Sequence, residues 1–297
     1  MRTTGPGATG PRERLGNGLF ARVAGPDGPR NRALIHGTPG PRWFGPERPV
    51  RRVHADASMF IGGLSALLLQ SLHPLAMAAV AAHSGFRGDP WGRLQRTSTF
   101  LATTTYGTAG HAQQACDQVR AVHARIHGVT ADGEAYRASD PHLLGWVHVA
   151  EIDSFLRAHQ RYGRHPLSDA ECDGYVADTA RIAQALGVPD PPRTRDELAA
   201  RLASYRPELR ATAAALDTTR FLLLSPPVPL AARLPYGVLA ANAVSLLPGW
   251  AADELRLPRL PLVDALCVRP LGTAVTVAIR WALAPARRAP VVPPGTP

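Results

Sequence analysis

The chain has 297 residues, of which 45% are hydrophobic and 19% are charged. This composition is typical of a globular protein with a substantial core and excludes a largely disordered chain. The formal net charge is +10, but the arginines are scattered and form no basic stripe or aromatic-interleaved basic motif. We therefore expect no nucleic-acid partner, and contact with an anionic membrane stays open as an alternative.

The cysteines and the N-terminus bear on the cellular compartment. Cys116, Cys172 and Cys267 are widely spaced and form no CxxC pair, so neither a disulfide framework nor a cysteine zinc site is indicated. No apolar run typical of a secretory signal occurs before residue 57. We expect a cytoplasmic protein, with peripheral membrane association as the alternative.

Composition divides the chain into three parts. Residues 1–44 are rich in Gly, Pro and Arg and are predicted to be a mobile extension that becomes ordered near Trp43 and Phe44. Residues 45–284 are predicted to be one domain, and residues 285–297 a Pro-rich tail.

Residues 57–86 contain no Asp, Glu, Lys or Arg, which raises the question of a transmembrane helix. Pro74 divides the stretch, and Gly, Ser, Gln and His residues interrupt it, so each piece is shorter than the roughly 20 apolar residues that a bilayer requires. The pattern favours two buried core helices.

Helix-start and helix-stop signals recur through the rest of the domain. Asp89-Pro90 and Asp140-Pro141 each resemble an N-cap followed by proline, and Ser168 and Thr194 each begin a capping-box pattern. Helices are predicted over 90–107, 108–126, 141–163, 168–187, from 194, 208–224, 229–247 and 271–283. No period-2 strand with a turn signal is evident. The predicted fold is all-α, a bundle of about eight or more helices.

The segment 108–126 carries a histidine on an apolar helix face. The small or apolar positions follow a 3.6-residue period: Ala112, Ala115, Cys116, Val119, Val122 and Ile126. His123 falls inside this stripe and His127 on its flank. One interpretation is a core histidine bonded to a carbonyl, and the other is a neutral imidazole that binds a metal or haem iron.

The preceding segment, 90–107, places an arginine on a largely apolar face. Arg93 and Thr97 are four residues apart, and Phe100, Leu101 and Thr104 continue the same face. Arg93 lies near the helix N-terminus, where the dipole favours anions rather than cations. It is either a solvated arginine or the partner of an anionic ligand such as a carboxylate or propionate.

The segment from Pro141 is apolar nearly all round and should be central. His148 and Glu151 are spaced i, i+3 and could reach one metal, but the order is reversed from the Glu-x-x-His motif of di-iron bundles and no second copy occurs. A buried hydrogen-bonded pair that orients other groups is the other interpretation. No GxGxxG after a strand, GxxxxGK[ST], GxSxG or HExxH motif occurs.

Several phrases together resemble the MpaB and latex-clearing-protein family, the rubber-oxygenase catalytic domain. They are "RVHADASMFIGGLSALLLQSLHPLAMAAVAAHSGFRGDP", "GRLQRTSTFLATTTYGT", "VRAVHARIHG" and "EAYRASDPHLLGWVHVAEIDSFLRAHQRYG", and the similarity extends over about residues 45–285. The resemblance implies an all-helical fold around a b-type haem with one proximal histidine.

The resemblance also implies roles for particular residues. The family's arginine and threonine four apart, followed by a histidine on the next helix, match Arg93, Thr97 and His123, and its basic residue before the threonine matches Arg96. The family often has arginine four residues after the histidine, where this chain has His127, so His127 is the alternative iron ligand. Latex-degrading members carry an acidic residue upstream of the arginine, and its absence from 57–86 argues against polyisoprene as the substrate.

The sequence therefore predicts a haem-b-dependent oxygenase that acts on an apolar organic substrate with O₂. His123 is the predicted iron ligand, and Arg93 and Thr97 are the predicted catalytic residues. The predicted cofactor-binding residues are Arg93, Arg96, Thr97, His123 and His148. His148 and Trp146 are further pocket candidates. The alternatives are a non-catalytic haem-binding protein and a haem-free helical protein that binds apolar ligands or a membrane.

Overall fold

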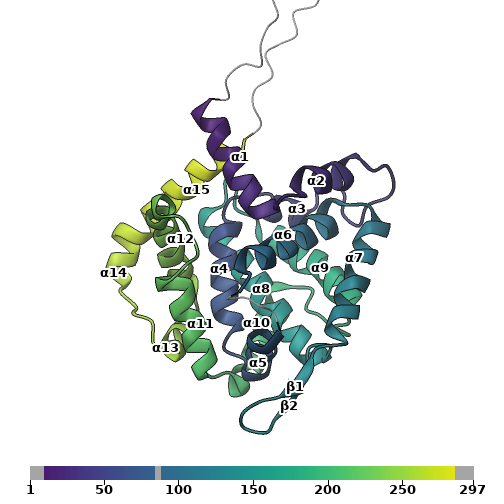
Figure 1. Cartoon of the computed structure of the whole chain (residues 1–297), viewed down its shortest axis with the longest axis vertical. Helices are drawn as coiled ribbons and strands as arrows, with labels where there is room; N and C mark the ends of the chain where they lie inside the picture. The colour runs from purple at the N-terminus through teal and green to yellow at the C-terminus, as the bar shows by residue number, and fades with distance from the viewer. Residues whose placement is uncertain (1–9, 84–87, 285–297) are drawn as a thin grey trace, which may run out of the picture.

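The computed structural model describes residues 10–83 and 88–284, and helices make up most of them. Figure 1 shows the helices gathered around α4 and α8, with α1 and α15 side by side at one end of the molecule. The first part of the domain contains α3 Pro49–His54, α4 Met59–Gln70, α5 Pro74–His83, α6 Pro90–Tyr106 and α7 Ala109–His123. The second part contains α8 Pro141–Tyr162, α9 Asp169–Leu186, α10 Arg195–Ser204, α11 Ala213–Leu224, α12 Arg233–Leu246, α13 Gly249–Glu254, α14 Pro261–Val263 and α15 Arg269–Leu283. Short 3₁₀ turns at Arg206–Glu208 (η1) and Leu230–Ala232 (η2) and a π-helical segment at Asp264–Val268 (η3) complete it. The all-α fold predicted from the sequence is confirmed.

Helix α8 forms the centre of the core. It packs against α4 along much of its length and also against α9 and α10. Trp146, Val149 and Ile152 on α8 are buried with Leu68 on α4 and Tyr175 on α9. The described part of this segment, 57–83, contains two helices, as predicted, because Pro74 begins α5 and most apolar side chains of α4 are buried. Residues 84–86 lie outside the described part.

The predicted helix caps are present where the signal was local. The side chains of Asp89 and Asp140 accept hydrogen bonds from the backbone N–H of Gly92 and His142, both at 2.8 Å. Ser168 and Glu171 form a complete capping box. At Thr194 the structure differs, because Glu197 accepts from the N–H of Arg193, one residue earlier than a capping box requires.

The N-terminal segment contains two helices where the sequence predicted a mobile extension. These are α1 Pro11–Ala24, which packs on α15 and α6, and α2 Gly28–Gly37, which packs on α6. Gly16 makes this packing feasible, since a Cβ there would collide with the backbone carbonyl of Ala282. Arg12 adds a hydrogen bond from Nε to the Trp281 carbonyl at 2.8 Å. Residues 1–9 and the predicted tail, 285–297, lie outside the described part.

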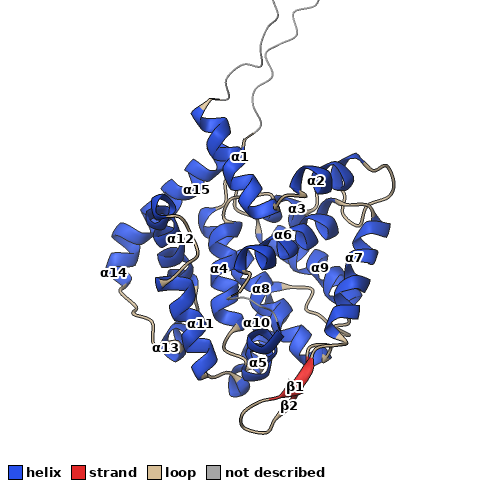
Figure 2. Cartoon of the chain, in the orientation of Figure 1, coloured by secondary structure: helices blue, strands red, loops and turns tan. Residues whose placement is uncertain are grey.

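The structure contains one β-hairpin that was not predicted from the sequence. Strands β1 His127–Val129 and β2 Ala135–Arg137 pair antiparallel, and they project from the lower edge of the molecule in Figure 2. Each strand has three residues and only Tyr136 is buried, so no alternating pattern is long enough to detect. Thr130 and Gly133, whose φ is +85°, form the turn.

Two regions are apolar enough to raise the question of membrane contact. Pro261–Leu283 is long enough to span a bilayer by length and composition, and only 11% of its apolar window is buried. The pair α4 and α5 passes the same test together but is bent by 108° at the break. Most of α4 and the first turn of α5 are buried in the core, whereas many large apolar side chains of the C-terminal helices are exposed.

Candidate functional site

His123 is the last residue of α7, and it lies on the side of this helix that faces α9. The first part of the predicted apolar stripe is present, since Ala112 and Cys116 are completely buried, but α7 ends at His123, so Ile126 lies beyond the helix. The stripe becomes more accessible toward the C-terminus, where His123 is half-buried and Val122 is exposed.

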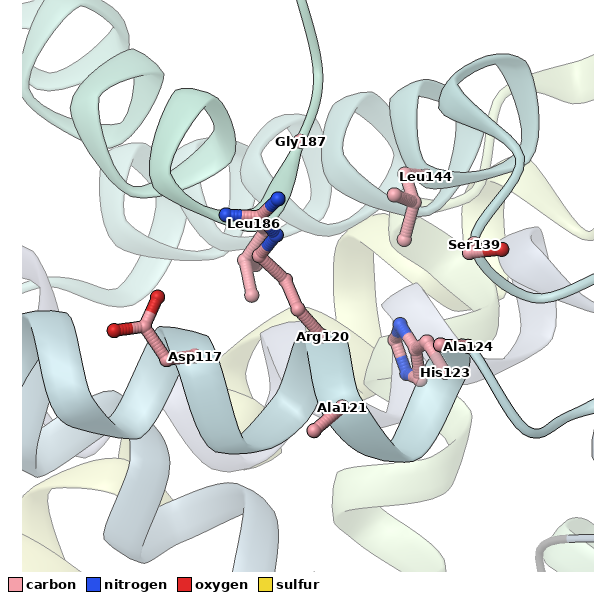
Figure 3. A pocket seen from close by; sticks show the side chains of 9 residues that line it. All are labelled: Asp117, Arg120, Ala121, His123, Ala124, Ser139, Leu144, Leu186 and Gly187. Carbon is pink, nitrogen blue, oxygen red and sulfur yellow. The ribbon is translucent and has the colours of Figure 1, made fainter.

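A pocket of about 440 Å³ opens beside His123. Figure 3 shows His123, Arg120 and Asp117 extending from α7 toward the wall formed by the end of α9 and the start of α8. Leu144 and Leu186 supply the apolar part of that wall. The full lining is Asp117, Arg120, Ala121, His123, Ala124, Ser139, Leu144, Leu186 and Gly187. The volume lies within the range of small-molecule sites.

A neutral imidazole and a cationic side chain both line the pocket. Burial lowers the pKa of His123, which favours the uncharged ring that can ligate a metal. Arg120 lies one helical turn earlier on the same face, and its guanidinium can pair with an anionic group of a ligand. The arrangement suits a ligand with an apolar body, a metal and an acidic edge.

The residues predicted on α6 do not line this pocket. Arg93 is half-buried, and burial together with the neighbouring Arg96 lowers the pKa of its guanidinium. Arg96 and Thr97 are exposed, and Arg96 pairs with Asp89 at 3.3 Å. Phe100 and Leu101 further along the same helix do pack against the core.

The remaining predicted residues occupy three different environments. His127 is exposed on β1, opposite Arg137. Trp146 is completely buried, and its indole Nε1 donates to the Gln70 carbonyl at 3.1 Å, so it lies in the core between α8 and α4. His148 faces the interior, on the side of α8 that also carries Glu151.

An interior polar group comprises four side chains, His54, His148, Glu151 and Tyr175, of which His148 and Glu151 are three residues apart on α8. The ring centroids of His54 and Tyr175 are 6.0 Å apart. Tyr175 is close enough to Glu151 for the carboxylate charge to contribute to the raised pKa of the Tyr175 hydroxyl. The His54 Nδ1 lies 2.8 Å from the Thr105 hydroxyl. Nε2 of His54, Nε2 of His148 and the Tyr175 hydroxyl are buried without a hydrogen-bond partner among the described residues. Unpaired buried polar groups are uncommon and call for an explanation, such as a bound ligand.

Burial sets the protonation states within the interior polar group. It lowers the pKa of His54 and of His148 to about 4, so both imidazoles are neutral at pH 7. It raises the pKa of Glu151 to about 7, so this carboxyl can hold or release a proton near neutrality. No described residue makes a hydrogen bond to the Glu151 carboxyl, so the hydrogen-bonded His148–Glu151 pair considered from the sequence is not observed.

Sequence reasoning missed His54 and Tyr175. A signal for His54 existed, because it follows the buried Val50 and Val53 at helical spacing and is another histidine beside an apolar face. The sequence contained no comparable signal for Tyr175, since an aromatic residue on an amphipathic helix is ordinarily a core residue. Only the tertiary structure brings α3, α8 and α9 together around these side chains.

The residues present fit a haem in two respects. His123 offers a neutral imidazole on a pocket of ligand size, and His54 has one ring nitrogen oriented by a hydroxyl while the other is buried and unpaired. Metal-bound histidines commonly have this second arrangement.

Comparison with known proteins identifies the family directly. The family described as ER-bound oxygenase mpaB/B'/Rubber oxygenase, catalytic domain, matches residues 51–281, which run from within α3 to the last turn of α15. No curated protein and no solved structure matches the chain. The matched segment contains the His123 pocket and the interior polar group, and it is most of the chain. The chain therefore belongs to the MpaB and rubber-oxygenase catalytic-domain family.

Proposed function

We propose that the chain is a haem-b-dependent oxygenase that uses O₂ to oxidise an apolar organic substrate. The observation that carries the proposal is the His123 pocket, where a neutral imidazole, an arginine and two leucines surround about 440 Å³ in a member of an oxygenase family. Haem iron, when bound, would supply the oxygen chemistry that protein side chains lack.

The residues of the pocket would have separate roles in binding the haem and excluding water. His123 would hold the iron, and Arg120, which lines the same pocket, would pair with a propionate. Arg93 lies outside this pocket and stays a predicted propionate partner only on the basis of the family pattern. Leu144 and Leu186 would contact the apolar parts of the ligand and exclude water from them. Thr97 and Arg96 stay predicted cofactor-binding residues on the basis of the family pattern.

The interior polar group supports a role in proton handling. Glu151 is the member of the group whose pKa is about 7, and the imidazoles of His54 and His148 in the same group are neutral at that pH. A carboxyl in this state can give a proton to a reacting oxygen or take one from a substrate. His148, with its unpaired buried Nε2, is a further candidate for the iron ligand besides the predicted alternative His127.

The visible spectrum of the purified full-length protein tests the proposal. A bound b-type haem gives a Soret band, and His123→Ala should lower the haem content and shift that band while the far-ultraviolet circular dichroism stays helical. His127→Ala is the matched control, because His127 is exposed on β1 and should leave both properties nearly unchanged. An unchanged spectrum in His123→Ala together with haem loss in His148→Ala would move the ligand to the interior.

Two other functions give different results in the same experiment. A haem-binding protein without catalytic activity would show the Soret band but no oxygen consumption over a panel of apolar substrates. A haem-free protein that binds apolar ligands would purify colourless and stay so after haem is added. Either result would overturn the proposed oxygenase activity.

A further inference from the structure

A second group of ligand-type side chains lies apart from the His123 pocket and the interior polar group. It comprises His73, in the turn between α4 and α5; His142, in the first turn of α8; and Glu208, the last residue of η1. One ligand atom from each of the three lies within 4.8 Å of the others. Three segments far apart in the sequence thus direct two imidazoles and one carboxylate to one point.

His73 is the member of this group that needs explanation. Its side chain is only 3% exposed, and neither ring nitrogen has a hydrogen-bond partner among the described residues. Nε2 lies 3.4 Å from Glu208 Oε2, close to the carboxylate but without hydrogen-bond geometry. A buried imidazole left unpaired costs free energy that a bound cation would recover.

The other two ligands are already positioned. His142 Nε2 lies 2.8 Å from Oε2 and 3.0 Å from Oε1 of Glu208. The Tyr205 hydroxyl donates to the His142 carbonyl at 2.8 Å, and the Arg210 N–H donates to the Leu72 carbonyl at 2.9 Å. These bonds fix the segment around η1 to the start of α8 and to the residue before His73.

We propose that His73, His142 and Glu208 bind a divalent transition metal, of which Zn²⁺ is the ion that best fits the donor set. Two imidazole nitrogens and a carboxylate are typical Zn²⁺ ligands, whereas Mg²⁺ and Ca²⁺ prefer oxygen donors alone. His142 and Glu208 are partly exposed, which leaves room for water at the fourth position. The ion would join the α4–α5 turn, α8 and η1, and it is independent of the proposed haem site.

Zinc titration of the chelator-treated full-length protein tests this site. We expect one equivalent of Zn²⁺ to bind, measured by competition with a chromophoric chelator, and to raise the Tm of the protein. His142→Ala and Glu208→Gln should each weaken the affinity by about 100-fold or more, because even changes around a ligand cost about 10–100-fold. Zn²⁺ should then no longer raise the Tm of these variants.

His165→Ala is the matched control, because His165 is exposed like His142 but lies outside the group. It should bind Zn²⁺ and gain Tm as the wild type does. Both ligand changes affect partly exposed side chains, and circular dichroism without zinc verifies that the variants are folded. The site is refuted if the wild type binds no stoichiometric Zn²⁺, or if His142→Ala and Glu208→Gln keep wild-type affinity.

Discussion

At the scale of single residues, the fold strongly raises the proton affinity of the Glu151 carboxyl. Its pKa rises from 4.5 to about 7 because the helices around it exclude water. The folded protein therefore keeps this proton while the unfolded chain loses it between pH 4.5 and 7, so Glu151 makes the protein less stable as the pH rises through that window. His54 and His148, with lowered pKa values, act in the opposite direction over the same range.

Glu151→Gln isolates the contribution of the carboxyl. We expect the unfolding free energy of the variant, minus that of the wild type, to increase by about 3 kcal/mol from pH 4.5 to 7, at about 1.4 kcal/mol per pKa unit. Urea unfolding at several pH values measures this difference. Glu134→Gln serves as the control because Glu134 is exposed in the hairpin. A difference that stays constant with pH would mean that Glu151 is solvated in the folded protein.

Among the elements, the contact between α4 and α8 depends on one small residue. A Cβ at Gly62 would lie 3.0 Å from Cδ1 of Phe155 and 3.1 Å from Cβ of Ala158. The nearest atom to a Cβ at Gly63 would be Phe155 Cε1 at 3.9 Å, an ordinary contact. Two adjacent glycines in one helix therefore have different functions in the packing.

The pair Gly62→Ala and Gly63→Ala tests this difference. Gly62→Ala should destabilise the protein by about 1 kcal/mol, because the extra methyl group overpacks the interface between α4 and α8. Gly63→Ala should be neutral or stabilise it by about 0.5–1 kcal/mol, since alanine favours the helix over glycine. Chemical denaturation of both variants measures the two effects. Equal changes in both would show that α4 and α8 are not in this close contact.

At the scale of the whole molecule, the C-terminal helices present an exposed apolar face. Leu230, Leu234, Leu262 and Leu266 are each at least 75% exposed, and they lie on η2, α12, α14 and η3. Figure 1 shows α12 and α14 along one edge of the molecule. Arg233 and Arg259 are exposed close to these leucines in the sequence, and the chain has a net charge of +10. Leucines flanked by arginines are typical of a surface that lies on an anionic bilayer.

We expect the protein to bind vesicles that contain phosphatidylserine more strongly than vesicles of phosphatidylcholine alone, and to be released as salt increases. Replacing both Leu262 and Leu266 with serine should reduce co-sedimentation with the anionic vesicles. Val129→Ser is the control, because Val129 is 65% exposed on the hairpin, outside this face. Equal sedimentation of the double variant and the wild type would exclude this face as the membrane contact.

The sequence by itself determined the helical class, most helix ends and the family. Helix caps such as Asp89, Asp140 and Ser168 could be predicted from the sequence because their hydrogen bonds join residues two or three positions apart. The two helices on either side of Pro74 followed from the same local rules. His123 could be singled out because its place in an apolar stripe is a property of one helix.

Only the tertiary structure decided what packs against what. The helices α1 and α2 lack a strong apolar face of their own and are stabilised by α15 and α6, which come much later in the chain. The interior polar group and the His73–His142–Glu208 group each combine segments that are separated by many residues. Local spacing carries no information about such contacts, because they depend on how whole helices exclude water from one another.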